Sequence, residues 1–547
     1  MTGREERRVD HRDEGRRGDL EFATIPRLAR IAADRSGDAE AIVDVDAGVT
    51  LSFRELLDAS RRAAGGLIEE GIEPGDRVAI WAPNVWEWVV AALGIHSVGG
   101  VLVPVNTRFK GREAAHVLAT SRTRLLFTVR GFLDTDYVAL LDGAELPALR
   151  SIVLVRGEPD AATPGRRVAP WNAFAASADG ALTEVERRAH EVAPDDVSDI
   201  LFTSGTTGAP KGVMTTHAQN LRAYRDWADV VGLRAGDRYL AVNPFFHAFG
   251  YKAGWLASLM TGATLLPHAV FDAEAVLERV PRDRISMLPG APALYQTILA
   301  RPDLDRHDLS SLRLAVTGAA AIPVSLVVEM RERLGFENVI TGYGLTEACG
   351  IATMCRHDDD PETIATTSGR AIPGVEVRIV GDDDDERATG EPGEVVVRGY
   401  NVMLGYFENA PETAATIDGD GWLHTGDIGV MDAHGNVTIT DRKKDLFIVG
   451  GFNVYPAEIE SLMLRHPAIS QVAVVGVPDD RLGEVGWAFV VSRPGVTPDP
   501  DEIRSWCRDE MANFKVPRRV VVVDELPLNA TGKVLKFELR ARAAAGA

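Results

Sequence analysis

The chain has 547 residues, of which 45% are hydrophobic and 25% are charged, an ordinary composition for a globular protein. At roughly 150 residues per folding unit, this length predicts three or four units. The formal net charge is −21, so we do not expect the general basic surface that binds nucleic acid or anionic membranes. An anionic ligand would need a local basic or dipolar site.

The cysteines and the apolar runs indicate the compartment. Cys349, Cys355 and Cys507 fit neither a metal-binding spacing nor a disulfide framework, which favours a reducing environment. No apolar run is long enough to cross a bilayer. Residues 1–19 carry charges of both signs and lack the apolar segment of a signal peptide. We therefore expect a cytoplasmic protein without an integral membrane segment, and a disordered charged extension at 1–19.

Helix-like and strand-like segments alternate from residue 22 to about 192. Apolar residues at helical spacing predict amphipathic helices at 23–35 and 53–71, and short apolar runs between Gly, Pro and Asn predict buried strands at 77–83 and 100–106. Such alternation is typical of α/β layers with mostly parallel strands, whose ligands lie at the carboxyl ends of the strands. Strands that end in a glycine turn continue this rhythm at 284–290, 312–320 and 337–344.

The stretch "DILFTSGTTGAPKG", residues 199–212, predicts a strand that leads into a loop rich in glycine and hydroxyl groups. Glycines allow backbone N–H groups to turn toward a phosphate, hydroxyl groups can donate to phosphate or bind Mg²⁺, and Lys211 adds a point charge. The spacing is not that of the usual P-loop, and a solvent-exposed turn is the alternative. The candidate phosphate-binding residues are Thr203, Ser204, Gly205, Thr206, Thr207, Gly208 and Lys211.

The pattern changes near residue 374. Apolar and polar residues alternate there with a period of two, which predicts a small antiparallel β unit over about 373–440. Its expected strands are 374–380, 393–399 and 436–441. From residue 446 onward, apolar strands and amphipathic helices predict a compact α+β domain of about 100 residues.

Six motifs in order resemble those of the adenylate-forming enzymes, the superfamily of acyl-CoA synthetases, peptide-synthetase adenylation domains and beetle luciferases. The loop at 199–212 is similar to the phosphate-binding loop of that family, and the resemblance covers about 22–539. The other motifs are "TGYGLTE" (341–347), "GWLHTGDIG" (421–429), "DRKKD" (441–445), "GGFNVYPAEIE" (450–460) and "LPLNATGK" (526–533).

The resemblance implies an α/β fold in two parts. A large N-terminal adenylation domain of layered α/β subdomains, with the small β unit as a barrel-like part, is expected at 20–440. A hinge is expected at 441–445 and a small mobile α+β C-terminal domain at 446–547. In this family the C-terminal domain rotates between two half-reactions, and hinge residues absorb the change in backbone dihedrals.

The resemblance also implies ATP, Mg²⁺ and coenzyme A. A carboxylate and ATP give an acyl-adenylate and pyrophosphate, and a thiol then displaces AMP. The resemblance implies that Lys533 bridges the acyl carboxylate and the α-phosphate, that Glu347 and Thr206 bind Mg²⁺, and that Thr346 contacts the α-phosphate. For the nucleoside, it implies that Asp427 and Arg442 hold the ribose and that Tyr343 and the turn Gly318, Ala319 and Ala320 flank the adenine. For the second half-reaction, it implies that Lys444 is the pivot of the domain rotation and that Gly450 and Gly451 face the CoA tunnel.

By the same resemblance, residues 245–260, "FFHAFGYKAGWLASLM", are expected to line one side of the acyl pocket. His247 is expected at the wall between the acyl and CoA channels, and a packed core histidine is the alternative. Lys252 is a lone lysine in an apolar run, and one hypothesis is that it donates a hydrogen bond to a substrate ketone. Alternatively, it reaches solvent or pairs with a nearby carboxylate. The expected substrate-binding residues are His247, Phe249, Lys252, Ala253 and Gly342.

These motifs predict an ATP-dependent carboxylic acid–CoA ligase. Several middle stretches further resemble the actinobacterial branch that activates the bicyclic propanoate of steroid breakdown, so a cyclic or polycyclic keto-acid is the expected substrate. Medium-chain or long-chain fatty acids and aryl acids remain alternatives. Transfer to a carrier protein, activation without CoA, a non-catalytic nucleotide-binding role and a homodimer also remain open. Residues 513–519, "NFKVPRR", offer charge for the CoA phosphates or form a solvated basic patch.

Overall fold

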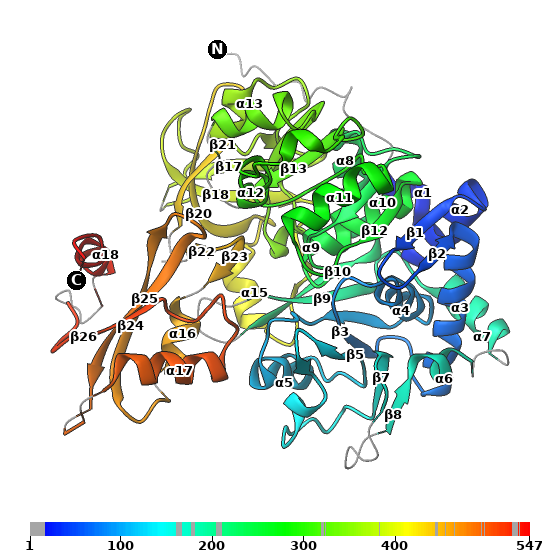
Figure 1. Ribbon diagram of the computed structural model, residues 1–547, viewed down its shortest axis with the longest axis horizontal. Helices are drawn as coiled ribbons and strands as arrows, with labels where there is room; N and C mark the ends of the chain where they lie inside the picture. Colours follow the sequence, from blue (N-terminus) through cyan, green and yellow to red (C-terminus); the bar gives the residue numbers. More distant parts are fainter. Residues whose placement is uncertain are drawn as a thin grey trace.

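The structure is a computed structural model that describes residues 17–159, 167–176, 181–203, 210–318, 322, 324–381, 383–442, 447–454, 456–463, 465–493, 495–496, 498–527, 534 and 536–546. Its strands form five sheets within these ranges, and helices alternate with them. Figure 1 shows a large N-terminal body with a smaller C-terminal unit beside it, which confirms the predicted α/β class. No helix within these ranges is long and apolar enough to cross a membrane.

The largest sheet has nine strands. In sheet order they are β19 (Gly405–Tyr406), β10 (Lys211–Thr216), β9 (Val197–Thr203), β4 (Val101–Pro104), β3 (Arg77–Trp81), β5 (Leu125–Phe132), β7 (Ser151–Arg156) and β8 (Arg167–Pro170), with β6 (Thr135–Asp136) paired to β5. The strands from β9 to β8 run parallel, whereas β10 pairs antiparallel with both β9 and β19. The predicted phosphate loop therefore follows the carboxyl end of β9.

Two four-stranded sheets lie side by side. One has the order β11 (Arg238–Ala241), β12 (Thr264–Pro267), β1 (Glu40–Asp44) and β2 (Val49–Ser52), and the other has β13 (Leu314–Gly318), β14 (Asn338–Tyr343), β15 (Thr353–Met354) and β16 (Arg370–Ala371). Met287 bridges them, since it pairs with Tyr239 on one side and Leu314 on the other. The parallel strands β13 and β14 end together, with Gly318 opposite Gly342.

Helices cover these sheets. They are α1 (Gly18–Phe22), α2 (Ile25–Ser36), α3 (Phe53–Glu69), α4 (Trp86–Ser97), α5 (Gly111–Thr120), α6 (Trp171–Ala176), α7 (Leu182–Glu191), α8 (His217–Val231), α9 (Ala248–Gly250), α10 (Ala257–Thr261), α11 (Ala273–Asp283), α12 (Pro292–Leu299), α13 (Val324–Glu332), α14 (Pro361–Thr366) and α15 (Ala410–Thr416), with a π-helical turn η4 (Tyr251–Leu256) and 3₁₀ turns η2 (Ala139–Leu141), η5 (Leu304–Arg306) and η6 (Thr346–Ala348).

Local sequence explains two of these helices. Ser52 and Glu55 form a reciprocal capping box that starts α3. Helix α4 is apolar on every side and is buried along almost its whole length, as expected for a helix enclosed by other elements. A single continuous hydrophobic core joins these helices to the sheets.

The small β unit is an antiparallel sheet in the order β17 (Val375–Val380), β18 (Gly393–Gly399), β20 (Leu423–Met431) and β21 (Val437–Arg442). Three of these strands match the predicted segments. The fourth, β20, carries the motif "HTGD" and was not predicted as a strand, because its glycines and threonine interrupt the apolar alternation.

The C-terminal unit contains β22 (Phe447–Val449), β23 (Phe452–Val454), α16 (Pro456–Met463), β24 (Ile469–Asp479), β25 (Gly483–Ser492), α17 (Pro500–Glu510), β26 (Arg519–Val522) and α18 (Lys536–Ala544). Alternate residues of β24 face opposite sides, because side chains in a strand alternate. Val472 and Val474 pack in one apolar cluster with α16 and α17, and Ala473 and Val475 pack in another with α18.

Candidate active site

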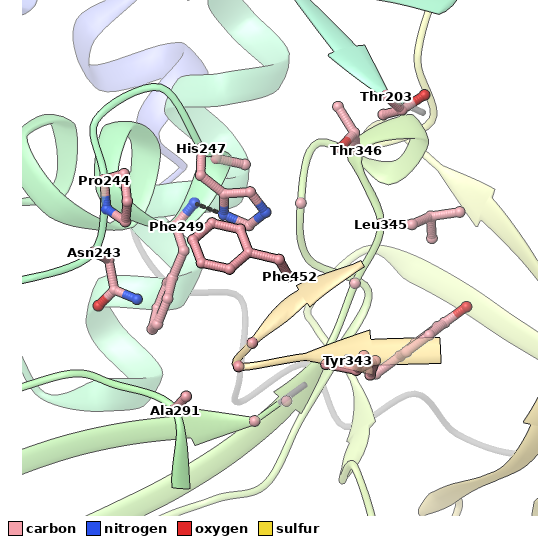
Figure 2. A pocket seen from close by; sticks show the side chains of 18 of the residues that line it. Thr203, Asn243, Pro244, His247, Phe249, Ala291, Tyr343, Leu345, Thr346 and Phe452 are labelled. Carbon is pink, nitrogen blue, oxygen red and sulfur yellow. Dashed lines mark hydrogen bonds between the residues drawn. The ribbon is translucent and has the colours of Figure 1, made fainter. Parts of the chain in front are cut away.

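A cavity of about 1910 Å³ opens where β9, β13 and β14 end. The loops after β11 and β12 and the hairpin β22–β23 complete its walls. Figure 2 shows two sides of this cavity: one carries Thr203, Tyr343, Leu345 and Thr346, and the other carries Asn243, Pro244, His247 and Phe249. The position agrees with the rule that α/β folds bind ligands at the carboxyl ends of strands.

Glu347 lies in the turn η6, directly after β14, and lines the cavity. Its Oε1 accepts hydrogen bonds from the Tyr406 hydroxyl at 2.9 Å and from the Thr203 hydroxyl at 3.4 Å. Burial raises the pKa of Glu347, although these two hydroxyl groups and the charge of Lys211 oppose the shift. The site therefore offers a carboxylate with two hydroxyl groups close to it.

Close packing fixes the backbone around Glu347. Cys349 has a φ of 56°, a left-handed conformation that costs a non-glycine residue roughly 1 kcal/mol. The Tyr224 hydroxyl donates to its carbonyl at 2.9 Å and holds it there. A Cβ at Gly344 would lie 2.2 Å from the Gly350 carbonyl oxygen, so only glycine fits at position 344. This packing sets the position of Thr346, which lines the cavity beside Glu347.

Lys211 starts β10 and also lines the cavity. Its ammonium group pairs with Glu412 and lies 5.2 Å from the centre of the Tyr406 ring. The structure therefore holds this lysine against Glu412 of α15 and near the ring of Tyr406, whose hydroxyl group donates to Glu347.

Asp427 and Tyr343 meet across the cavity wall. The Tyr343 hydroxyl donates to Asp427 Oδ2 at 2.6 Å, and Asp427 is only 4% exposed. A carboxylate can accept about four hydrogen bonds, so Asp427 can accept from a ligand as well as from Tyr343. The backbone of Arg442 lies opposite Asp427 in the β20–β21 pair, and Gly318 lines the cavity near the end of β13.

His247 faces the cavity from the N-cap of α9. Its Nδ1 accepts from the Phe249 backbone N–H at 3.3 Å, which leaves the proton of the neutral ring on Nε2. The ring is accessible from the cavity, and the protein around it lowers its pKa. Phe249, Ala253 and Gly342 line the same cavity, as their predicted roles require.

Lys252 does not line the cavity, and the prediction that it reaches a substrate ketone was wrong. Its side chain is completely buried, with Nζ 3.2 Å from Asp199 Oδ1 and 3.0 Å from Thr215 Oγ1. The prediction assumed an α-helix, but residues Tyr251–Leu256 form a π-helical turn, whose wider period changes the direction of each side chain. The alternative, pairing with a nearby carboxylate, is the one found.

The hairpin β22–β23 brings residues of the C-terminal unit to the cavity. Gly450 and Gly451 have φ values of 55° and 84°, where any side chain is strained, and both line the cavity. A Cβ at Gly451 would lie 3.5 Å from the Ala291 side chain. The side chain of Phe452 lies between the two walls of the cavity (Figure 2). Its ring stacks on the ring of Phe514, with 4.6 Å between the ring centres.

Lys515 joins the C-terminal unit to the large domain. Its Nζ lies 2.6 Å from Glu113 Oε1 on α5 and 2.7 Å from Glu458 Oε1 on α16, and the residue is only 3% exposed. Burial alone would lower the pKa of Lys515, but the two carboxylates raise it. Because Lys515 is buried and doubly paired, it is not a solvated residue, and the contact of residues 513–519 with CoA phosphates stays a prediction.

Several predicted site residues lie outside the described part of the chain, and their roles stay predictions. They are Ser204, Gly205, Thr206, Thr207, Gly208, Ala319, Ala320, Lys444 and Lys533. For Arg442 the structure describes only the backbone.

Tyr406 and Asn84 are among the cavity residues that were not predicted. Tyr406 approaches Glu347 from the short strand β19, and no local pattern marks it. Asn84 is 5% exposed and lines the cavity three residues after β3. A polar residue just after a predicted parallel strand is a typical ligand position, so the sequence did contain a signal for Asn84.

Comparisons with known proteins agree with this geometry. A family model described as "AMP-binding enzyme" matches residues 29–407, and one described as "AMP-binding enzyme C-terminal domain" matches residues 458–533. A 7a-methyl-1,5-dioxo-octahydro-1H-inden-4-yl-propanoyl:CoA ligase of Rhodococcus jostii is 50% identical over 520 residues, which cover 94% of this chain and 98% of the relative. The ligase of the same description from Mycobacterium tuberculosis is 51% identical and covers 95% and 98%.

Solved structures show the same architecture. The amide bond synthetase McbA from Marinactinospora thermotolerans has a TM-score of 0.81 at 31% identity, over 94% of this chain and 99% of that one. A fatty acyl CoA synthetase of Mycobacterium tuberculosis has a TM-score of 0.67 at 30% identity, over 97% and 99%. Family models match both parts of the chain, and the described motif residues Tyr343, Glu347 and Asp427 line one cavity. This chain belongs to the AMP-binding enzyme family.

Proposed function

We propose that this protein is an ATP-dependent acid–CoA ligase. The observation that carries the proposal is that Glu347, Asp427 and His247 face a single cavity, together with the glycine pair of the hairpin β22–β23. This arrangement supports two reactions at one place. The acid and ATP give acyl-AMP and pyrophosphate, and acyl-AMP and CoA then give acyl-CoA and AMP.

In the first half-reaction, the protein positions the acid and ATP and stabilises the negative charge that develops on the α-phosphate. A carboxylate oxygen of the acid attacks the α-phosphorus, and the bond to pyrophosphate breaks. We propose that Asp427 accepts from the ribose hydroxyls, that Thr346 donates to the α-phosphate, and that Tyr343 lies against the adenine. Their positions around the cavity support these roles.

The residues around Glu347 suit a magnesium ion. Mg²⁺ prefers oxygen ligands and is usually held by one or two carboxylates together with substrate phosphates. Glu347 supplies the carboxylate, and the hydroxyl group of Thr203 lies 3.4 Å from it. The described residues contain no group of three or more acidic, histidine or cysteine side chains that could hold an ion without the nucleotide. Bound there, Mg²⁺ would neutralise phosphate charge.

In the second half-reaction, the CoA sulfur attacks the acyl carbon and AMP leaves. We propose that Gly450 and Gly451 face the pantetheine chain, because residues without side chains allow close approach. His247, neutral with its proton on Nε2, lies in the same cavity and suits the wall between acid and thiol. Lys533 and Lys444 are proposed as the cation of the first half-reaction and the pivot between the two.

The proposed acid is a bicyclic keto-acid with a propanoate side chain, of the kind formed in steroid breakdown. Support comes from the two relatives at 50% and 51% identity, whose descriptions name a dioxo-octahydroindenyl propanoyl group. Relatives described as medium-chain acyl-CoA ligase and feruloyl-CoA synthase share only 32–36% identity. Fatty and aryl acids therefore have weaker support.

A pyrophosphate-release assay over a panel of acids, with and without CoA, tests this function. The bicyclic keto-acid should release pyrophosphate faster than straight-chain or aryl acids, and AMP release should require CoA. Lys533→Ala should lose pyrophosphate release by about 100-fold to 1000-fold but still form thioester from a supplied acyl-adenylate. AMP release that depends on an amine or a carrier protein instead of CoA would overturn the proposal.

A further inference from the structure

The wall of the cavity that carries Asn243 is largely apolar. Asn243 follows β11 by two residues and lies on the side of the cavity that Figure 2 shows with Pro244 and Phe249. The apolar side chains that line the cavity around this segment are Trp227, Val242, Pro244, Phe249, Ala253 and Phe271. Such a wall suits a hydrocarbon ring system, and the amide is an exception that needs a reason.

The amide of Asn243 has no partner in the part of the chain that the structure describes. Its Oδ1 is buried and accepts no hydrogen bond. A buried polar group without a partner is costly, so proteins usually satisfy such groups or use them for function. Among the described cavity-lining residues, only Thr317 has another buried side-chain atom of this kind. Thr317 precedes Gly318 at the predicted adenine turn. Asn243 is therefore the residue with a buried, unpaired side-chain atom on the acyl side of the cavity.

The backbone that carries Asn243 is held firmly by Asn84. The Asn84 Nδ2 donates to the carbonyls of Ala241 at 2.8 Å and Asn243 at 2.9 Å, and its Oδ1 accepts from the Phe245 N–H at 2.8 Å. These three bonds fix the main chain on both sides of Asn243. The side chain of Asn243 is therefore presented from a rigid segment, and its Nδ2 group, rather than the buried Oδ1, is the group available to a ligand.

We propose that the Asn243 amide donates a hydrogen bond from Nδ2 to a ring ketone of the acid, and so selects keto-acids over hydrocarbon rings of the same shape. A ketone only accepts hydrogen bonds, and the NH₂ group of an asparagine supplies two donors. The inference rests on the proposed function, because it assigns the ketone that the acid carries to a residue. Lys252 is paired with Asp199, so it is not a candidate for this hydrogen bond.

The test compares four acids that share one bicyclic propanoate skeleton: the dioxo-acid, the two mono-oxo acids and the acid with no ketone. Pyrophosphate release gives kcat/KM for each acid with the wild type, Asn243→Leu and Asn243→Ala. Val242→Ala serves as the matched control, since it alters the same wall without removing a polar group. The preference of each variant is the ratio of its kcat/KM values, which a partial loss of folded protein leaves unchanged because it lowers all four values equally.

We expect the kcat/KM of the wild type to be about tenfold higher for acids that carry one particular ketone, because a neutral hydrogen bond contributes a free energy of that size. Both Asn243 variants should lose this preference by lowering kcat/KM only for those acids, and Val242→Ala should keep it. Equal loss on all acids, or a preference that survives in Asn243→Leu, would overturn the inference and leave the CoA ligase function standing. A wild type that uses straight-chain acids better than all four would overturn the proposed substrate together with this inference.

Discussion

Asp199 and Lys252 form an ion pair with no exposed side-chain surface. Asp199 Oδ1 also accepts from Thr215 at 2.9 Å, and its Oδ2 accepts from Ser198 at 2.8 Å and from Asn220 at 2.6 Å. Such a network can offset the free-energy cost of taking two charges out of water, because the carboxylate oxygens of Asp199 accept hydrogen bonds from several donors. The pair joins β9, which leads into the predicted phosphate loop, to the turn η4 behind the acyl wall.

Lys252→Met should therefore act on stability rather than on substrate choice. Removing the lysine leaves Asp199 as an unpaired buried charge, and we expect a loss of about 3–5 kcal/mol in the free energy of unfolding. Denaturant unfolding followed by tryptophan fluorescence measures this loss. The double variant Asp199→Asn/Lys252→Met should recover much of it. Arg187→Met, which breaks exposed pairs with Glu184 and Glu191, should cost less than about 1 kcal/mol.

His96 and His217 give the core a sensitivity to acid. Their rings lie 5.3 Å apart and both residues are at most 1% exposed. Burial lowers the pKa of His96 to about 3, and burial together with the nearby His96 lowers the pKa of His217. Unfolding returns both to about 6.5, so below that pH the unfolded chain binds more protons and stability falls with the pH.

His96→Gln tests this acid sensitivity. Between pH 7.5 and pH 5, protonation of His96 in the unfolded state should cost the wild type about 2 kcal/mol. The variant should lack that part of the decline, although it starts less stable because His96 Nε2 lies 3.2 Å from the Tyr251 hydroxyl. Unfolding free energies at the two pH values give the slopes. Parallel slopes for the two proteins would contradict the assignment.

At the scale of elements, the ends of strands were the most predictable positions. Thr203, Gly318 and Tyr343 end β9, β13 and β14, and glycine turns after apolar runs marked all three. Hydrophobic periodicity reports a strand and its end because both are local properties. The turn η4 was not predictable in this way, since a π-helical turn depends on packing, and the buried partner of Lys252 lies 53 positions earlier in the chain.

The hairpin β22–β23 places a strained glycine against the large domain. Gly451 has a φ of 84° and faces Ala291. Gly451→Val should strain the hairpin by roughly 1–3 kcal/mol and crowd this contact, so we expect acyl-CoA formation from acyl-adenylate to slow at least tenfold. Pyrophosphate release should stay within twofold. Gly435→Val is the matched control, because Gly435 has a φ of 82° and nothing within 4 Å of its Cβ position.

At the scale of the whole molecule, contacts between residues far apart in sequence join elements, both within the large domain and between the two parts. Lys515 and Glu113 are 402 positions apart, and Lys211 and Glu412 are 201 positions apart. No local pattern identifies such partners, which is why the sequence suggested a phosphate contact for the stretch around Lys515. The family motifs predicted the two-part fold, while the pairings that orient the parts became visible only in three dimensions.

The Glu113–Lys515–Glu458 group should favour the arrangement in which the hairpin β22–β23 lines the cavity. Glu113 accepts from Lys515 and also from the Ala512 backbone N–H at 3.1 Å, so it binds the C-terminal unit at two points. Glu113→Ala removes both bonds, and a hydrogen bond to a charged group is worth about 1.5–3 kcal/mol. We expect single-turnover acyl-CoA formation from preformed acyl-adenylate to slow by about tenfold, with the pyrophosphate burst unchanged within twofold.

Two further variants separate this effect from a general loss of contact. Glu113→Gln keeps an acceptor for the Ala512 N–H and should lose less than Glu113→Ala. Arg112→Ala removes the neighbouring pair with Glu510, but Arg112 is 62% exposed, so this change should slow acyl-CoA formation less than twofold. If Glu113→Ala slowed both half-reactions equally, or if Arg112→Ala matched it, the buried group would not set the arrangement of the two parts. A selective loss in Glu113→Ala alone would mean that one buried lysine, shared by carboxylates from both parts, stabilises the arrangement in which the thiol reacts.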